Sequence, residues 1–128
     1  MTAENMHAIV RDDASAEWFD AAAEGRLLIR RCGEGHVSAP QTTTCPECGS
    51  TALQWIQVPG NGVLVSYAVV ERRGADPLPV AIVELDEGPW MRMQIQDTDP
   101  ATLSVGLPVV VRFATPEGGE PLPYAVPP

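Results

Sequence analysis

Three cysteines and one histidine are the residues of this chain whose spacing indicates chemistry. Cys45 and Cys48 are separated by two residues, and Gly49 follows the second of them. Such a pair makes a tight turn that directs two thiolates toward one metal ion. Cys32 and His36 lie upstream at a distance that can complete four ligands, so the sequence predicts a zinc site held by these four residues. A closed set of four ligands stabilises structure and does not activate water.

The zinc interpretation has alternatives that the residues leave open. Water or an acidic side chain, such as Glu34 or Glu47, could replace His36 as the fourth ligand, and His7 is a more distant option. A metal-free relic, in which the cysteines are ordinary thiols in a turn, is the other alternative. Zinc is favoured because a module of about twenty residues cannot bury a core unaided.

A redox role for the pair Cys45 and Cys48 is disfavoured. Thioredoxin-like pairs normally lie at a helix N-terminus within a βαβ pattern, where the helix dipole lowers a thiol pKa. The surroundings predicted here are strands and turns. Three cysteines also do not make a disulfide framework.

The segments around these ligands predict a mainly β chain with an N-terminal helix. The helix is expected to begin at Asp13 or Ser15 and to end at Gly25, with Trp18 and Phe19 on its apolar face. Strand candidates separated by glycine and proline follow at residues 27–32, 53–58, 62–71, 79–85, 90–96 and 107–113. The last five suit a small closed barrel such as the OB-fold.

Changes in composition along the chain predict four parts. Residues 1–26 make an arm and the helix, 27–52 a zinc ribbon, 53–115 the OB-fold barrel, and 116–128 a tail that holds five prolines. The tail is expected to be extended, and the sequence assigns it no strand partner.

The net charge of −9 argues against nucleic acid as a partner. Seventeen acidic residues face eight basic ones, all of them arginine. Nucleic-acid binding draws much of its affinity from basic residues that neutralise phosphates, and this surface would repel a polyanion. No apolar run approaches the roughly 20 residues of a membrane span. Residues 1–13 are polar where a signal peptide would be apolar, so a cytoplasmic chain without membrane attachment is expected.

Catalysis by this chain alone finds no support in the sequence, and no catalytic residue is assigned. Only His7 and His36 could serve a Ser/His/Asp set, and the metal site uses His36. Glu84, Asp86 and Glu87 could act as acid and base, but the glycine and proline beside them indicate a solvated turn.

The arginines and tryptophans could bind a ligand, but each group also has a purely structural explanation. The arginines form two clusters, Arg72 with Arg73, and Arg26 with Arg30 and Arg31. They could meet the phosphates of CoA, although partner contact or plain solvation explains them equally well. Trp55 and Trp90 are expected in the barrel core rather than as a stacking platform for bases.

The order of these features resembles the DUF35 family of OB-fold proteins associated with acyl-CoA. The likeness runs from about the helix to Phe113 and depends on the order and spacing of several short segments. The matching segments are Glu24–Leu28, Arg31–Cys32, Cys45–Ser50, Pro59–Val63, Ser66–Tyr67, Ala81–Pro89 and Gly106.

The resemblance implies a rubredoxin-like zinc ribbon, a C-terminal OB-fold and an accessory role. Family members are similar to one another in working beside thiolase-fold enzymes: acyltransferases, ketoacyl-CoA thiolases and aldolases that cleave steroid side-chain CoA esters. The thiolase-fold subunit carries the chemistry, and the small subunit supports it and helps to hold the acyl-CoA. The family's first knuckle is Cys-x-x-Cys-Gly, whereas Gly35 stands here at the second cysteine position. Either His36 replaces that ligand or the site is degenerate.

We therefore expect a cytoplasmic, non-catalytic accessory subunit with structural zinc. It would bind and stabilise a thiolase-fold enzyme acting on acyl-CoA esters, in lipid or steroid side-chain degradation; this partner rests on the resemblance alone. One alternative is a free-standing acyl-CoA-binding module, which predicts affinity for CoA esters in the isolated chain. A nucleic-acid-binding protein predicts salt-sensitive binding to single strands, and an enzyme in its own right lacks a catalytic constellation.

Overall fold

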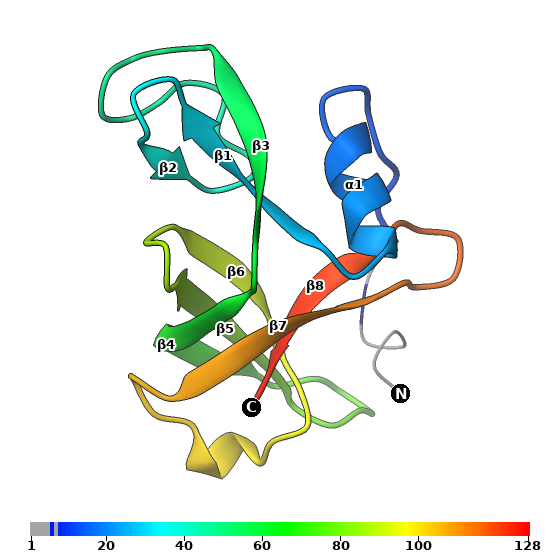
Figure 1. The fold of residues 1–128 in the computed structure, drawn as a ribbon. Helices are drawn as coiled ribbons and strands as arrows, with labels where there is room; N and C mark the ends of the chain where they lie inside the picture. Colours follow the sequence, from blue (N-terminus) through cyan, green and yellow to red (C-terminus); the bar gives the residue numbers. More distant parts are fainter. Residues whose placement is uncertain (1–5, 7) are drawn as a thin grey trace.

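A computed structural model of the chain describes Met6 and residues 8–128, and it is mostly β-structure (Figure 1). The elements in chain order are α1 (Ala16–Ala23), β1 (Leu27–Cys32), β2 (Val37–Ser38), β3 (Leu53–Val58), β4 (Asn61–Val70), β5 (Leu78–Leu85), β6 (Trp90–Ile95), the 3₁₀ helix η2 (Pro100–Thr102), β7 (Pro108–Ala114) and β8 (Leu122–Val126). No described helix is long and apolar enough to cross a membrane. The predicted fold class, with its helix, ribbon region and five-stranded closed barrel, is confirmed.

The helix α1 forms where the sequence predicts it and is fastened to the ribbon. Its start follows a local exchange of hydrogen bonds between Asp12 and Ser15. It ends at Ala23, shortly before Gly25, whose φ of 77° suits glycine. Trp18 is buried, and its indole Nε1 donates to the carbonyl of Leu28 in β1 at 2.9 Å. The helix therefore packs its aromatic face inward and fixes the first strand of the ribbon.

The strand β3 belongs to the ribbon and not to the barrel, which differs from the expectation from sequence. The ribbon sheet has the order β2-β1-β3, and β1 pairs antiparallel with β3 from Leu27 opposite Val58 to Cys32 opposite Leu53. Six residues of β3 thus match the six of β1 along their whole length. This long-range pairing satisfies both backbones, a partnership that strand propensity alone does not reveal.

The fifth barrel strand is β8, which comes from the proline-rich tail. The barrel closes in the order β4-β5-β6-β8-β7, with β8 antiparallel to β7 and parallel to β6. Ala125 is fully buried and belongs to the core cluster, and the next residue, Val126, is 8% exposed. The tail is extended, as expected, but it pairs on both sides. The four-part division of the chain itself remains a prediction.

One core runs from the barrel through the ribbon strands to α1. Side chains of β5 and β6 alternate, and those pointing inward are Ala81, Val83, Leu85, Met91, Met93 and Ile95. The same buried cluster includes Trp18 of α1 and Ile29 of β1. The small ribbon therefore shares a core with its neighbours rather than depending on its own.

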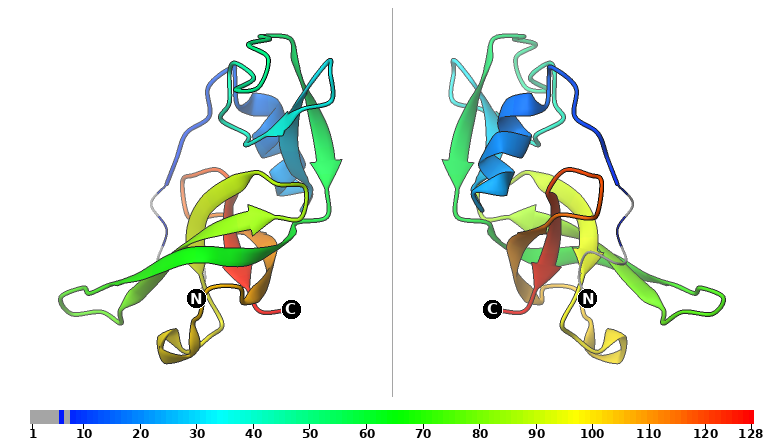
Figure 2. Two further views of the ribbon diagram at one scale, coloured as in Figure 1. Left: turned by 90° about the vertical axis from the view of Figure 1, so that its left-hand side faces the viewer. Right: turned by 90° about the vertical axis from the view of Figure 1, so that its right-hand side faces the viewer.

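The tryptophans predicted to lie in the barrel core lie elsewhere. Trp90 begins β6 on its outer side, is 53% exposed and donates from Nε1 to the Glu84 carboxylate at 2.8 Å. Trp55 lies in β3 and packs against the core from the ribbon. The alternation of β6 decides the first case, because Met91 occupies the inward position and the preceding residue must point outward. Figure 2 shows that the hairpin of β4 and β5 extends well beyond the barrel.

Candidate metal centre

The first turn of the centre joins β1 to β2 and presents Cys32 and His36. The backbone N–H of Gly35 donates to the Cys32 carbonyl at 3.0 Å, and the N–H of Cys32 donates to the His36 carbonyl at 2.9 Å. Gly35 has a φ of 92°, a conformation that favours glycine. Glycine at the position of the family's second cysteine thus suits this turn, and His36 is the next residue along.

The second turn presents Cys45 and Cys48 from the loop between β2 and β3. The N–H of Gly49 donates to the Cys45 carbonyl at 2.8 Å, and the N–H of Cys45 donates to the Ser50 carbonyl at 2.8 Å. Gly49 again takes a positive φ, of 76°. This closed turn brings both sulfurs to the same side, as the Cys-x-x-Cys-Gly spacing predicts.

The four predicted ligand atoms converge on one point. The Sγ atoms of Cys32, Cys45 and Cys48 and a ring nitrogen of His36 all lie within 4.8 Å of one another. The Nδ1 of His36 is 3.4 Å from the Cys32 sulfur and 3.7 Å from the Cys45 sulfur, and the sulfurs of Cys48 and Cys32 are 3.8 Å apart. Tetrahedral zinc separates two sulfur ligands by about 3.8 Å and a sulfur from a nitrogen by about 3.6 Å. The donor set therefore fits a zinc ion in number, chemistry and spacing.

The two acidic alternatives lie outside this group. Neither Glu34 nor Glu47 belongs to the cluster of converging donor atoms, and His7 lies outside the described residues. Cys32 and Cys45 are buried and Cys48 is exposed, and all three are free thiols without a disulfide. The structure thus brings together the predicted set and leaves one sulfur of the set at the surface.

The surroundings prepare one thiol for binding a cation. Burial by itself raises the pKa of Cys32, but hydrogen bonds from the backbone of Glu34 and His36 and from the neighbouring thiols bring it down to about 7. A hydrogen bond from the Ser50 backbone lowers the pKa of Cys48, but burial and the other thiols outweigh it and the net direction is upward. Since the thiolate is the metal-binding form, this lowered pKa favours metal binding at Cys32.

The arginine clusters make local contacts in the structure. Arg26 pairs with Glu24, and Arg72 donates to the Asp76 carbonyl inside the turn of the β4–β5 hairpin. Arg30 stacks on Trp55, a contact that depends on the pairing of β1 with β3. Sequence reasoning grouped Arg30 with its neighbours and missed this contact, because its only signal is a register between distant strands.

In a comparison with known proteins, two family models match consecutive parts of the chain. Residues 19–54 match a family model described as the rubredoxin-like zinc ribbon domain of ChsH2, and residues 55–114 match the C-terminal OB-fold domain of ChsH2. A DUF35 domain-containing scaffold protein of Pyrococcus furiosus is 30% identical over 100 residues, which are 74% of this chain and 74% of that protein.

Two further relatives belong to enzyme systems. A probable enoyl-CoA hydratase alpha subunit of Thermomonospora curvata is 35% identical over 117 residues; these are 86% of this chain but only 36% of that longer protein. Among solved structures, the Ltp2-ChsH2(DUF35) aldolase contains a chain that is 32% identical with a TM-score of 0.78. The match covers 95% of this chain and 98% of that one.

Proposed function

We propose that this chain, which belongs to the DUF35 family, is a non-catalytic accessory subunit of an enzyme that acts on acyl-CoA esters. The observation that carries the proposal is the whole-chain likeness to a component of the Ltp2-ChsH2(DUF35) aldolase. The relative named as a hydratase alpha subunit supports it, because there a similar segment is part of a longer chain named for acyl-CoA chemistry.

The partner in this proposal is a thiolase-fold aldolase, thiolase or acyltransferase of lipid or steroid side-chain degradation. The family resemblance of the sequence motivates this choice, and the surface charge agrees with it. A chain of net charge −9 is attracted to a protein that carries basic patches, which speeds their encounter and favours the correct orientation. Binding would stabilise the partner and shape its substrate channel.

The metal centre has a structural role in this proposal. Cys32, His36, Cys45 and Cys48 would hold one zinc ion, which ties the turn after β1 to the loop before β3. A closed Cys₃His set leaves no open position for substrate, so zinc here would supply rigidity rather than Lewis-acid chemistry. The ribbon so fixed, together with α1, would present a defined surface to the partner.

The test is affinity capture of the tagged chain from its native cells, at low and at moderate salt, followed by mass spectrometry and size-exclusion chromatography. We expect a thiolase-fold enzyme to be recovered in a fixed ratio at both salt concentrations. Capture of the chain by itself under both conditions would contradict the accessory-subunit role. If that isolated chain also bound acyl-CoA measurably, the alternative of a free-standing acyl-CoA-binding module would replace it.

A further inference from the structure

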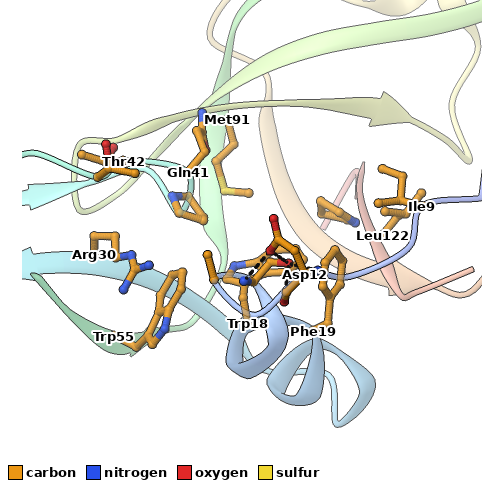
Figure 3. Close-up of a pocket in the computed structure, with 15 residues that line it drawn as sticks. Ile9, Asp12, Trp18, Phe19, Arg30, Gln41, Thr42, Trp55, Met91 and Leu122 are labelled. Carbon is orange, nitrogen blue, oxygen red and sulfur yellow. Dashed lines mark hydrogen bonds between the residues drawn. The ribbon is translucent and has the colours of Figure 1, made fainter.

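A cleft of about 560 Å³ lies where the helix, the ribbon and the barrel meet (Figure 3). Its walls include Trp18 and Phe19 of α1, Trp55 of β3, Met91 of β6 and Leu122 of β8. These walls are mainly apolar, and the volume lies within the range of sites that bind small molecules, roughly 300–1,000 Å³. The metal ligands are not among the lining residues, so the cleft is separate from the metal centre.

Among the described residues that line the cleft, Arg30 is the only basic one. Its guanidinium lies over the ring of Trp55, with Cζ 3.4 Å from the ring centroid, and Figure 3 shows the two side chains face to face. The cross-strand pairing of β1 with β3 sets these residues opposite each other. Stacking of this kind fixes the plane and direction of a guanidinium.

The cation of Arg30 has no anionic partner within the described part of the chain. No hydrogen bond or ion pair reaches its guanidinium there, and Nε is buried without an acceptor. Burial lowers the pKa of Arg30. The negative charge of Glu17 partly offsets this effect. A partly desolvated, unpaired cation is costly, and a buried polar atom without a partner calls for an explanation, which a ligand that pairs with it would supply.

The acidic group of the cleft is already engaged. The carboxylate of Asp12 accepts hydrogen bonds from the backbone N–H and the hydroxyl of Ser15 at 2.9 and 2.7 Å. The described lining thus holds one cation and one anion, and the anion already accepts hydrogen bonds whereas Nε of the cation has no acceptor. A single negative charge on a ligand matches this arrangement, whereas a phosphate-rich molecule would also face Asp12 and an acidic protein.

We propose that this cleft binds a small organic monocarboxylate with an apolar chain. The carboxylate would accept hydrogen bonds from the terminal nitrogens of Arg30, and the chain would lie along Trp18, Met91 and Leu122. Arginine binds a carboxylate through two parallel hydrogen bonds, and a poorly hydrated cleft strengthens them. Such binding would need no partner enzyme and no metal.

The first test compares octanoate with octan-1-ol on the full wild-type chain, with binding followed by the NMR signals of the tryptophan indole N–H groups. We expect octanoate to shift the signals of Trp18 and Trp55 and to bind about tenfold or more tightly than the alcohol. Equal affinities would overturn the role of the charge. If CoA shifted the same signals and bound more tightly than octanoate, the carboxylate assignment would be overturned in favour of a phosphate ligand.

The second test uses two substitutions with the same charge change. Arg30→Gln removes the cleft cation, and Arg31→Gln removes the neighbouring exposed arginine of β1 as a control. We expect octanoate affinity to fall about tenfold or more in the first variant and less than about twofold in the second. Equal losses would contradict the site. Were Arg30→Gln to unfold, the comparison of acid with alcohol on the wild-type chain would still decide the proposal.

Discussion

The guanidinium of Arg11 donates hydrogen bonds of 3.0 and 2.8 Å to the two carboxylate oxygens of Glu120, which lies 109 residues further along the chain. The backbone agrees with this link, because the N–H of Glu120 donates to the Ile9 carbonyl at 3.0 Å. A Cβ on Gly119 would come within 2.9 Å of Ala8. The residues before α1 are therefore held against the loop that leads into β8.

The first prediction concerns this contact between the chain's two ends. Arg11→Gln should loosen the contact of residues 8–11 with the loop before β8, because a bidentate ion pair is lost and only the backbone contact remains. Hydrogen exchange measured by mass spectrometry should be faster for the peptide that holds the Glu120 amide, which donates to the Ile9 carbonyl, and unchanged for β5 and β6. Asp20→Asn is the matched control, since it removes only a single bond to Arg11. Equal effects of the two variants would contradict the importance of Glu120.

The same contact predicts a dependence on pH. The hydrogen bond from Arg11 holds the pKa of Glu120 below its ordinary value of 4.5. A carboxyl group whose pKa is depressed by folding stabilises the folded form above its unfolded pKa, and that contribution disappears as the pH falls through the folded pKa. Protection of the Glu120 amide should therefore persist above about pH 5 and fall in more acidic solution. Glu120→Gln should abolish this pH dependence.

The second prediction concerns the stabilising role of zinc. Cys45→Ser should lower both the bound zinc and the melting temperature, the latter by roughly 10 °C or more, because the ribbon loses a ligand that ties its turns together. Metal analysis and thermal unfolding measure the two effects. Ser50→Ala, in the same turn, is the control and should retain zinc. Protein that binds no zinc, with a melting temperature unaffected by Cys45→Ser, would contradict a structural metal.

The third prediction identifies the fourth ligand. His36→Ala should reduce zinc affinity by at least about tenfold, whereas His36→Cys should retain zinc as a Cys₄ site. The reason is that Nδ1 of His36 lies with the three sulfurs, while Glu34 and Glu47 lie outside the group. Competition with a chelator measures the affinities. A larger loss in Glu34→Gln or Glu47→Gln than in His36→Ala would assign the ligand to an acid.

The fourth prediction tests the close approach of β4 and β5. A Cβ on Gly62 would clash with the Glu84 carbonyl and lie 2.9 Å from Cγ1 of Val83. Gly62→Ala should therefore reduce the free energy of unfolding by about 2 kcal/mol or more, because backbone cannot move aside cheaply. A Cβ on Gly33 would have no neighbour within 4 Å, so Gly33→Ala should change the free energy of unfolding little. Chemical denaturation of both variants provides the comparison, and similar stabilities would contradict the packing of these strands.

The fifth prediction concerns the closing strand of the barrel. Truncation after Thr115 removes β8, so β6 and β7 lose their shared partner and become open edges. We expect that protein to be unfolded or aggregated, as judged by circular dichroism and size-exclusion chromatography. Removal of Pro127 and Pro128 alone leaves the strand intact and should have little effect. A folded, monomeric truncation at residue 115 would show that β8 is dispensable.

The sequence by itself predicted the fold class and the four residues whose donor atoms converge in the structure. Cys45 and Cys48 lie in one turn, and Cys32 and His36 lie in another, so short-range spacing places each pair correctly. The helix was also predictable, because capping residues and an apolar face act within a few residues. Alternating strands with glycine and proline between them indicated the barrel for the same local reason.

The tertiary structure alone decided which strands share a sheet and which side chains meet. Strand propensity could not assign β3 to the ribbon or β8 to the barrel, because a strand's partner depends on residues far away in the chain. The stacking of Arg30 on Trp55 and the ion pair of Arg11 with Glu120 depend on the same distant pairings. Local preferences act over a few residues, whereas burial and strand pairing are properties of the complete fold, and these created the cleft at its centre.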